Sequence, residues 1–156
     1  MNQKILIVYD SGTGNTEKMA LAVAEGVKGD ATAIVKKVDV TTLEDLLEAD
    51  AIIIGSPTYY GLMSAKIKDL FDKSVKIHGK LSGKVGAAFT SSGGTATGAE
   101  TTVLSILEAM LVHGMIVQGR ADSKHYGIAC VGTPDEESVN LCRSLGERTA
   151  LLTAKV

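Results

Sequence analysis

Residues 5–16 read Ile5-Leu6-Ile7-Val8-Tyr9-Asp10-Ser11-Gly12-Thr13-Gly14-Asn15-Thr16, an apolar run that leads directly into a loop of glycines and polar side chains. The run predicts a buried β-strand, and the residues after the loop predict a helix that starts at once. Glycines let the backbone approach an anion, and a helix N-terminus offers it free N–H groups and a positive dipole end. Because no Lys or Arg lies in the loop, residues 11–16 are expected to hold a phosphate monoester through neutral hydrogen bonds.

Composition places the chain among ordinary globular proteins. Its 156 residues are enough for a core, and we expect a single domain over residues 1–156. A net charge of −2 predicts no general attraction to nucleic acid or to an anionic membrane. No apolar run is long enough to span a membrane, and the start of the chain is unlike a signal peptide. Cys130 and Cys142 lack metal-ligand spacing, so we expect two buried thiols and a cytoplasmic protein.

Short apolar runs alternate with helical patterns along the chain. The runs cover residues 5–8, 34–35, 51–54, 85–89, 115–117 and 128–131. Runs rich in Val and Ile are typical of strands buried on both faces, as in a parallel sheet. The alternation predicts an α/β fold, with a doubly wound sheet of five parallel strands between two layers of helices. Capping boxes that start at Thr41, Thr97 and Thr133 are expected to begin helices.

Two further loops that follow strands have an unusual composition. The first of these, residues 55–61, ends with Pro57, Thr58, Tyr59, Tyr60 and Gly61. Two adjacent tyrosines offer a surface on which a planar ring can stack. The other, residues 90–98, contains Ser91, Ser92, Gly93 and Gly94. Such small residues allow close approach to the edge of a ring. Structural interpretations stay open for both, namely a loop anchored in the core by one tyrosine and a flexible surface loop.

Carboxyl ends of parallel strands meet at one edge of a sheet, so the three loops are expected to meet there. A phosphate monoester that carries a flat ring with hydrogen-bonding edges fits all three, and FMN is such a ligand. The motifs Ser11-x-Thr13-Gly14-Asn15-Thr16, Gly55-Ser56-Pro57-Thr58-Tyr59-Tyr60-Gly61 and Thr90-Ser91-Ser92-Gly93-Gly94 resemble the flavodoxin family. This resemblance covers essentially the whole chain, and it implies bound FMN and the flavodoxin-like strand order 2-1-3-4-5.

Later motifs resemble the NAD(P)H:quinone oxidoreductases named for tryptophan-repressor-binding protein. The matching residues are 55–58, 98–101, 113–115 and 126–127. By this resemblance His113 would contact FMN, and Tyr126 is also expected near the flavin. A purely structural role stays open for His113, because a cation suits the end of a helix. The chain is shorter than that branch, lacking its extra segment after the third strand, and is less acidic than electron-carrier flavodoxins.

Two functions follow from these patterns. The favoured one is an FMN-dependent electron carrier between a reductase and an acceptor protein, which suits the short chain. The alternative is an NAD(P)H:quinone oxidoreductase, in which bound FMN passes two electrons to a quinone. Neither requires a metal or a catalytic side chain, and both are compatible with a monomer or a homo-oligomer. In a third interpretation, residues 12–17 begin a dinucleotide fingerprint and Asp39 binds a ribose, but Glu17 stands where that fingerprint needs glycine.

Overall fold

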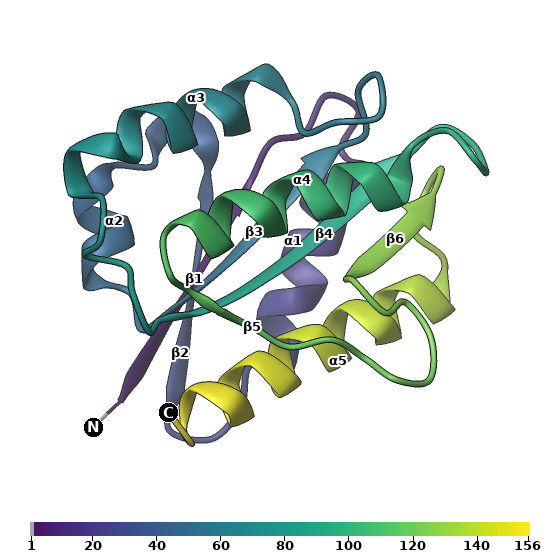
Figure 1. Ribbon diagram of the computed structural model, residues 1–156. Helices are drawn as coiled ribbons and strands as arrows, with labels where there is room; N and C mark the ends of the chain where they lie inside the picture. The colour runs from purple at the N-terminus through teal and green to yellow at the C-terminus, as the bar shows by residue number, and fades with distance from the viewer. Residues whose placement is uncertain (1) are drawn as a thin grey trace.

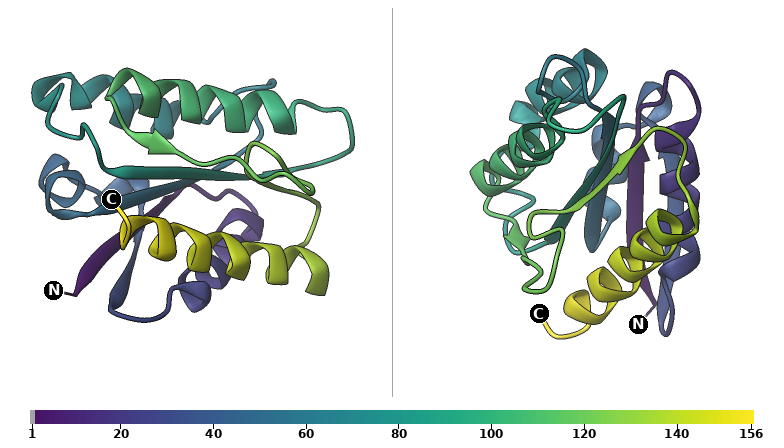
Figure 2. Two further views of the ribbon diagram at one scale, coloured as in Figure 1. Left: turned by 60° about the horizontal axis from the view of Figure 1, so that its bottom comes forward. Right: turned by 90° about the vertical axis from the view of Figure 1, so that its right-hand side faces the viewer.

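Helices cover both faces of a parallel sheet in the computed structural model, which describes residues 2–156 (Figures 1 and 2). The elements are β1 (Gln3–Tyr9), α1 (Asn15–Gly26), β2 (Ala31–Lys37), the 3-10 turn η1 (Val38–Val40), α2 (Leu43–Glu48), β3 (Ala51–Pro57), α3 (Ala65–Lys73), η2 (Ser74–Ile77), β4 (Val85–Ser92), α4 (Ala99–Val112), β5 (Ile116–Val117), β6 (Ile128–Val131) and α5 (Glu136–Thr153). The strand order is β2-β1-β3-β4-β5, which confirms the predicted order.

Side chains that alternate along each strand build two separate apolar layers. Leu6 and Val8 of β1 pack in the layer under α3 and α4. Ile5 and Ile7 point the opposite way, into the layer that α1 and α5 cover. Because successive side chains of a strand face opposite sides of the sheet, a strand covered on both faces must be apolar throughout. Both free cysteines are buried, as the sequence predicts.

The fifth position of the sheet holds two short strands, which correspond to the predicted apolar runs 115–117 and 128–131. β5 pairs with Val85 and Gly86 at the start of β4, whereas β6 pairs with the second half of β4. The polar segment 118–127 leaves the sheet between them and passes beside α5 (Figure 1). Arg148 of α5 fixes this segment by donating a hydrogen bond from Nη2 to the Gly119 carbonyl, at 2.9 Å.

The three predicted helix starts are each displaced by one or two residues, and two of these helices keep a side-chain cap. In α2 the capping box is formed by Thr42 and Asp45, one position after the box expected at Thr41. The cap of α5 is Asp135, whose carboxylate accepts the N–H of the third helical residue, and not Thr133. Both replacements follow from chemistry, because a neighbouring Thr or Asp caps a helix as well as the predicted residue does.

Candidate functional site

The three loops meet at the carboxyl edge of the sheet (Figure 1). Asp10, after β1, donates its backbone N–H to the Gly55 carbonyl at 3.1 Å. Thr58, after β3, donates its backbone N–H to the Ser91 carbonyl at 2.7 Å. The Thr16 hydroxyl is bonded to the Ser91 hydroxyl at 2.8 Å in a buried position. These contacts join the first loop to the third and the second to both, as the parallel topology predicts.

The first loop presents free backbone N–H groups at the N-terminus of α1. Ser11 Oγ accepts the N–H groups of Gly14, at 3.1 Å, and Glu17, at 3.3 Å. The N–H groups of Asn15 and Thr16 lie in the first helical turn, where a helix supplies no acceptor. Within residues 2–156 they bond to no other group. These two donors, with the adjoining exposed Gly12 and Thr13, form a neutral site that suits a phosphate.

The second loop ends in a tight turn that separates the two tyrosines. Tyr59 and Leu62 exchange two backbone hydrogen bonds of 3.1 Å. Tyr60 and Gly61 between them both have positive φ, 50° and 77°, which defines a type I′ turn and explains the glycine. The Tyr59 hydroxyl reaches the first loop, since a Cβ on Gly12 would lie only 2.9 Å from it. Tyr60 is fully exposed, so the two rings have different surroundings.

The third loop touches the second through two glycines. A Cβ on Gly98 would lie 2.4 Å from the Gly61 Cα, and Gly98 has a φ of 102°. α4 begins directly after Gly98, so the predicted cap at Thr97 is wrong. Thr97 instead donates its hydroxyl to the Gly94 carbonyl at 2.8 Å, which closes the loop. Gly98, the last residue of the predicted loop 90–98, therefore joins the candidate site residues, and its signal is a glycine immediately before a helix.

A fourth loop, after β6, also reaches this edge. Gly132 donates its backbone N–H to the Ser92 carbonyl at 2.8 Å, and Ser92 donates its hydroxyl to Gly94. A single glycine after a strand carries no specific signal, so Gly132 could not be predicted as a site residue from the sequence. Gly93 is exposed beside these contacts.

The structure does not bring His113 to the three loops of the same chain, so its expected contact with FMN gains no support from this geometry. His113 follows α4, and Ile116 shortly after it pairs with Val85, the first residue of β4. The loops lie beyond Ser92, seven residues along β4, which is roughly 23 Å away at about 3.3 Å per residue. Because α4 runs antiparallel to the strands, its last residue lies at the opposite edge of the sheet.

Tyr126 lies next to the middle of β4, and its proximity to the flavin stays a prediction. It precedes Gly127, which passes so close to β4 that a Cβ there would lie 2.3 Å from the Ala88 carbonyl oxygen. The half-exposed Tyr126 ring borders a cavity of about 280 Å³ that also contacts Glu100 and Val103 in α4.

His113 has a structural role that fixes its tautomer. The Ser74 hydroxyl donates to the Phe71 carbonyl at 2.6 Å, so its oxygen accepts a hydrogen bond from the Nε2–H of His113 at 2.7 Å. Nδ1 of His113 is then an unprotonated acceptor, buried and without a partner within residues 2–156. Burial, and then the nearby His78, lower the pKa of His113.

Acidification is therefore expected to destabilise the protein through His113. A histidine whose pKa is lower in the folded state contributes full stability above its unfolded pKa of about 6.5. That stability is lost as the pH falls through this value toward the folded pKa, because the unfolded chain takes up the proton first. Urea unfolding at pH 7.5 and pH 5.5 measures the loss. His113→Gln should lose less unfolding free energy between these pH values than wild type does. The exposed control His125→Gln should lose as much as wild type. Equal pH dependence in all three proteins would contradict this role of His113.

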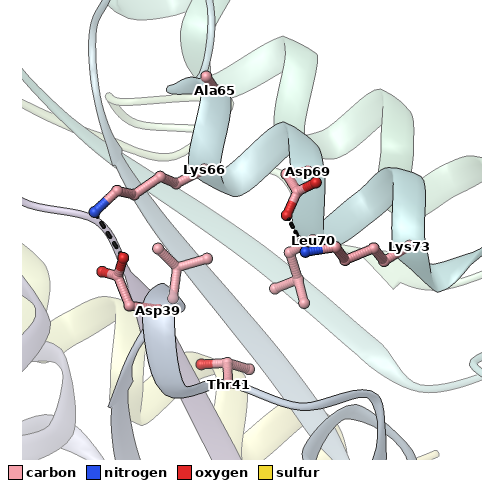
Figure 3. Close-up of a pocket in the computed structure, with 8 residues that line it drawn as sticks. Asp39, Thr41, Ala65, Lys66, Asp69, Leu70 and Lys73 are labelled. Carbon is pink, nitrogen blue, oxygen red and sulfur yellow. Dashed lines mark hydrogen bonds and ion pairs between the residues drawn. The ribbon is translucent and has the colours of Figure 1, made fainter.

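A cavity lies between η1 and α3 (Figure 3). It has a volume of about 410 Å³. Two ion pairs line it, Lys66 with Asp39 and Lys73 with Asp69, each at 2.6 Å. The hydrogen bond from Lys66 lowers the pKa of Asp39. Asp39, the ribose ligand of the dinucleotide interpretation, is thus already paired, and every charge that lines this cavity has a partner.

Two features are absent from residues 2–156. No group of three or more His, Cys, Asp or Glu side chains is placed to hold a metal ion. No helix in this part of the chain has both the length and the apolar character needed to cross a membrane.

Comparison with known proteins agrees with this geometry. The family model described as NADPH-dependent FMN reductase matches residues 35–124. A flavodoxin of Aquifex aeolicus is 43% identical, over 94% of this chain and 85% of that protein. An NAD(P)H dehydrogenase (quinone) of Archaeoglobus fulgidus is 35% identical, over 98% of both chains. The crystal structure of a flavodoxin, WrbA-like protein from Agrobacterium tumefaciens superposes with a TM-score of 0.84 at 28% identity, over 98% of both chains. The chain therefore belongs to the flavodoxin-like family of FMN proteins.

Proposed function

We propose that the three loops bind FMN and that the protein carries electrons between redox proteins. The observation that supports this most is the pair of free N–H groups on Asn15 and Thr16 beside two loops joined at Gly61 and Gly98. The donors suit a phosphate ester without a neighbouring Lys or Arg. The remaining proposed contacts are Ser11 to Gly14 with the phosphate, and Pro57 to Gly61 and Ser91 to Gly94 with the ribityl chain and ring.

FMN supplies the electron chemistry when bound, and the protein binds and orients it. In this proposal the N-terminus of α1 fixes the phosphate. Tyr59 closes the space between the first and second loops and shields the ligand from water. The type I′ turn presents the Tyr60–Gly61 peptide to the ring edge, and positive φ at Gly61 lets that peptide reorient at little cost.

The two tyrosines are expected to differ in their effect on FMN affinity. Tyr59→Ala removes a ring that bridges two loops, and should weaken FMN binding about 10-fold, the equivalent of one aromatic contact. Tyr60→Ala removes a ring that is fully exposed. Because the proposed contact of Tyr60 is through its backbone peptide, this variant should leave FMN affinity unchanged. Quenching of FMN fluorescence gives both dissociation constants. Equal losses, or a larger loss for Tyr60→Ala, would contradict the assignment of Tyr59 as the contact.

Carrier function is supported by the surface that surrounds the site. Tyr60 and Leu62 at the tip of the second loop are exposed, which leaves an apolar contact for a partner protein beside the cofactor. The Aquifex flavodoxin is also the more similar of the two named relatives. The alignment with the Archaeoglobus quinone dehydrogenase spans 188 positions against the 156 residues of this chain, so that relative has inserted residues that this chain lacks.

The alternative is an NAD(P)H:quinone oxidoreductase. It is supported by the match to the FMN reductase family model and by the Archaeoglobus quinone dehydrogenase, which aligns over 98% of both chains. Steady-state oxidation of NADH and NADPH by the FMN-loaded protein with a soluble quinone separates the two functions. Carrier function predicts slow turnover that rises when a flavin-dependent reductase is added. Fast turnover by the protein alone would replace the carrier proposal with the alternative.

A further inference from the structure

A cavity of about 160 Å³ lies where the fifth strand is interrupted. One wall is formed by residues 86–88 of β4, where the pairing of this strand changes from β5 to β6. The segment 118–127 forms the opposite wall, and Leu145 and Arg148 of α5 close one end. The volume is about five times the roughly 30 Å³ that one water molecule occupies in the liquid. The cavity is therefore large enough for a tetrahedral oxyanion.

The segment that forms this wall is held in a defined conformation. Arg120 and His125 are joined twice, by the Arg120 N–H to the His125 carbonyl at 3.1 Å and by His125 Nδ1 to the Arg120 carbonyl at 2.7 Å. Gly127 donates its N–H to the Lys124 carbonyl at 3.2 Å. Because these bonds fix the backbone, the charged side chains that the segment carries are positioned before any ligand arrives.

Positive charge in this cavity exceeds negative charge. Its lining includes Arg120, Lys124 and Arg148 but no carboxylate. Asp122, outside the lining, pairs with Arg120 at 2.7 Å, whereas no ion pair within residues 2–156 includes Lys124 or Arg148. Burial, and then the charge of Arg120, lower the pKa of Arg148. Two guanidinium groups thus repel one another at a site where solvent screening is reduced.

Arg120 also has a buried donor that nothing satisfies. Its side chain is only 20% exposed, and Nη1 has no hydrogen-bond partner within residues 2–156. A buried N–H of a charged group costs free energy unless it finds an acceptor. An anion beside Arg120 and Arg148 would supply that acceptor and also offset the excess charge.

We propose that this cavity binds the phosphate group of a small ligand, at a site separate from the FMN loops. The guanidinium fork matches the geometry of phosphate oxygens, and such charge-assisted bonds are about twice as strong as neutral ones. The ammonium of Lys124, which forms no ion pair within residues 2–156, adds a third cation to the lining. Asp122 stays paired with Arg120 on the outside and orients it.

The phosphate can be free or part of a larger molecule. The cavity of about 280 Å³ beside Tyr126 shares four lining residues with this one, 124–127. A phosphoester with an aromatic group could extend into it and contact the exposed Tyr126 ring. Inorganic phosphate and adenosine monophosphate are therefore the two probes that distinguish the sources.

The test uses protein saturated with FMN, so that the phosphate site of the first loop is already filled. Melting temperatures are measured in sodium phosphate and in sodium chloride at equal ionic strength, with and without adenosine monophosphate. Phosphate should raise the melting temperature of wild type above the chloride value. Arg148→Ala should bind about 10- to 100-fold more weakly, the loss expected for one charge-assisted hydrogen bond. Tighter binding of adenosine monophosphate than of phosphate would identify an organic phosphoester as the ligand, and the reverse would identify free phosphate.

The matched control is Arg143→Ala on the same helix. Arg143 is exposed and pairs with Glu25 at 2.7 Å, away from the cavity, so this variant should keep the phosphate response. Amide shifts of Gly119 and Arg120 on phosphate addition give a second readout that does not depend on the stability of the variant. The proposal is overturned if neither phosphate nor adenosine monophosphate raises the melting temperature above the value in chloride. It is also overturned if Arg148→Ala keeps the full phosphate response, as Arg143→Ala should. Arg148→Ala should bind FMN as tightly as wild type does. A lost phosphate response in this variant would then reflect the cavity and not the FMN site.

Discussion

Replacing Gly98 with alanine is expected to weaken FMN binding about 100-fold, the equivalent of nearly 3 kcal/mol of strain at the site. Two effects add at this position. Its φ of 102° is one that alanine rarely adopts, and the new Cβ would lie 2.4 Å from the Gly61 Cα. Because the clash is with backbone, the second and third loops must move apart. Both loops then lose the arrangement in which they contact the ligand.

Gly79→Ala is the matched control for this prediction. Gly79 has a similar φ of 83°, and no atom lies within 4 Å of its added Cβ. It follows η2, after His78, and takes no part in the loops. Gly79→Ala should lower stability but leave the FMN dissociation constant within about twofold of wild type. If Gly98→Ala binds FMN as tightly as Gly79→Ala does, the contact between the two loops is not required for binding.

Gly146→Ala is expected to destabilise the protein by about 3 kcal/mol, the upper range for inserting a carbon atom into a packed interior. An added Cβ would lie 2.0 Å from the Val23 carbonyl oxygen, where α5 crosses α1. Gly26 on α1 makes the reciprocal approach, since its Cβ would lie 1.8 Å from the Arg143 carbonyl oxygen. The two helices therefore pack backbone to backbone at these glycines, and an alanine on either one forces them apart.

Whether Gly146→Ala lowers or raises the free energy of unfolding shows which of two effects dominates, the clash between the helices or the higher helix propensity of alanine. In an exposed helix, Gly→Ala stabilises by about 1 kcal/mol, so propensity alone predicts a more stable protein. Urea unfolding of wild type, Gly146→Ala and the exposed neighbour Glu147→Ala measures the difference. Glu147→Ala should stay near wild type. A Gly146→Ala variant that is as stable as wild type would mean that α1 and α5 are not in close contact here.

The parts of the fold that follow from periodicity could be predicted from the sequence. Runs such as residues 5–8 and 51–54 are apolar at every position because both faces of the sheet are covered. Parallel topology then fixes the edge at which the three loops gather, and the contacts of Thr16 and Thr58 with Ser91 agree with it.

Other features depend on tertiary contacts that a linear pattern does not contain. Residues 115–117 and 128–131 look like two ordinary strands in sequence, and only their pairing with β4 shows that they share the fifth position of the sheet. His113 was placed near the ligand by a resemblance, although the direction of α4 carries it to the far edge. The importance of Gly98 becomes visible only beside Gly61.

The most direct test of the account is a ¹H–¹⁵N NMR titration of the protein with FMN. The account predicts that the largest amide shifts fall in the first, second and third loops, with Asn15, Thr16 and Gly98 among them and His113 unaffected. The competing location is the cavity of about 410 Å³ beside α3 (Figure 3). Shifts concentrated at Asp39, Lys66 and the rest of that cavity, with the loops unchanged, would contradict it.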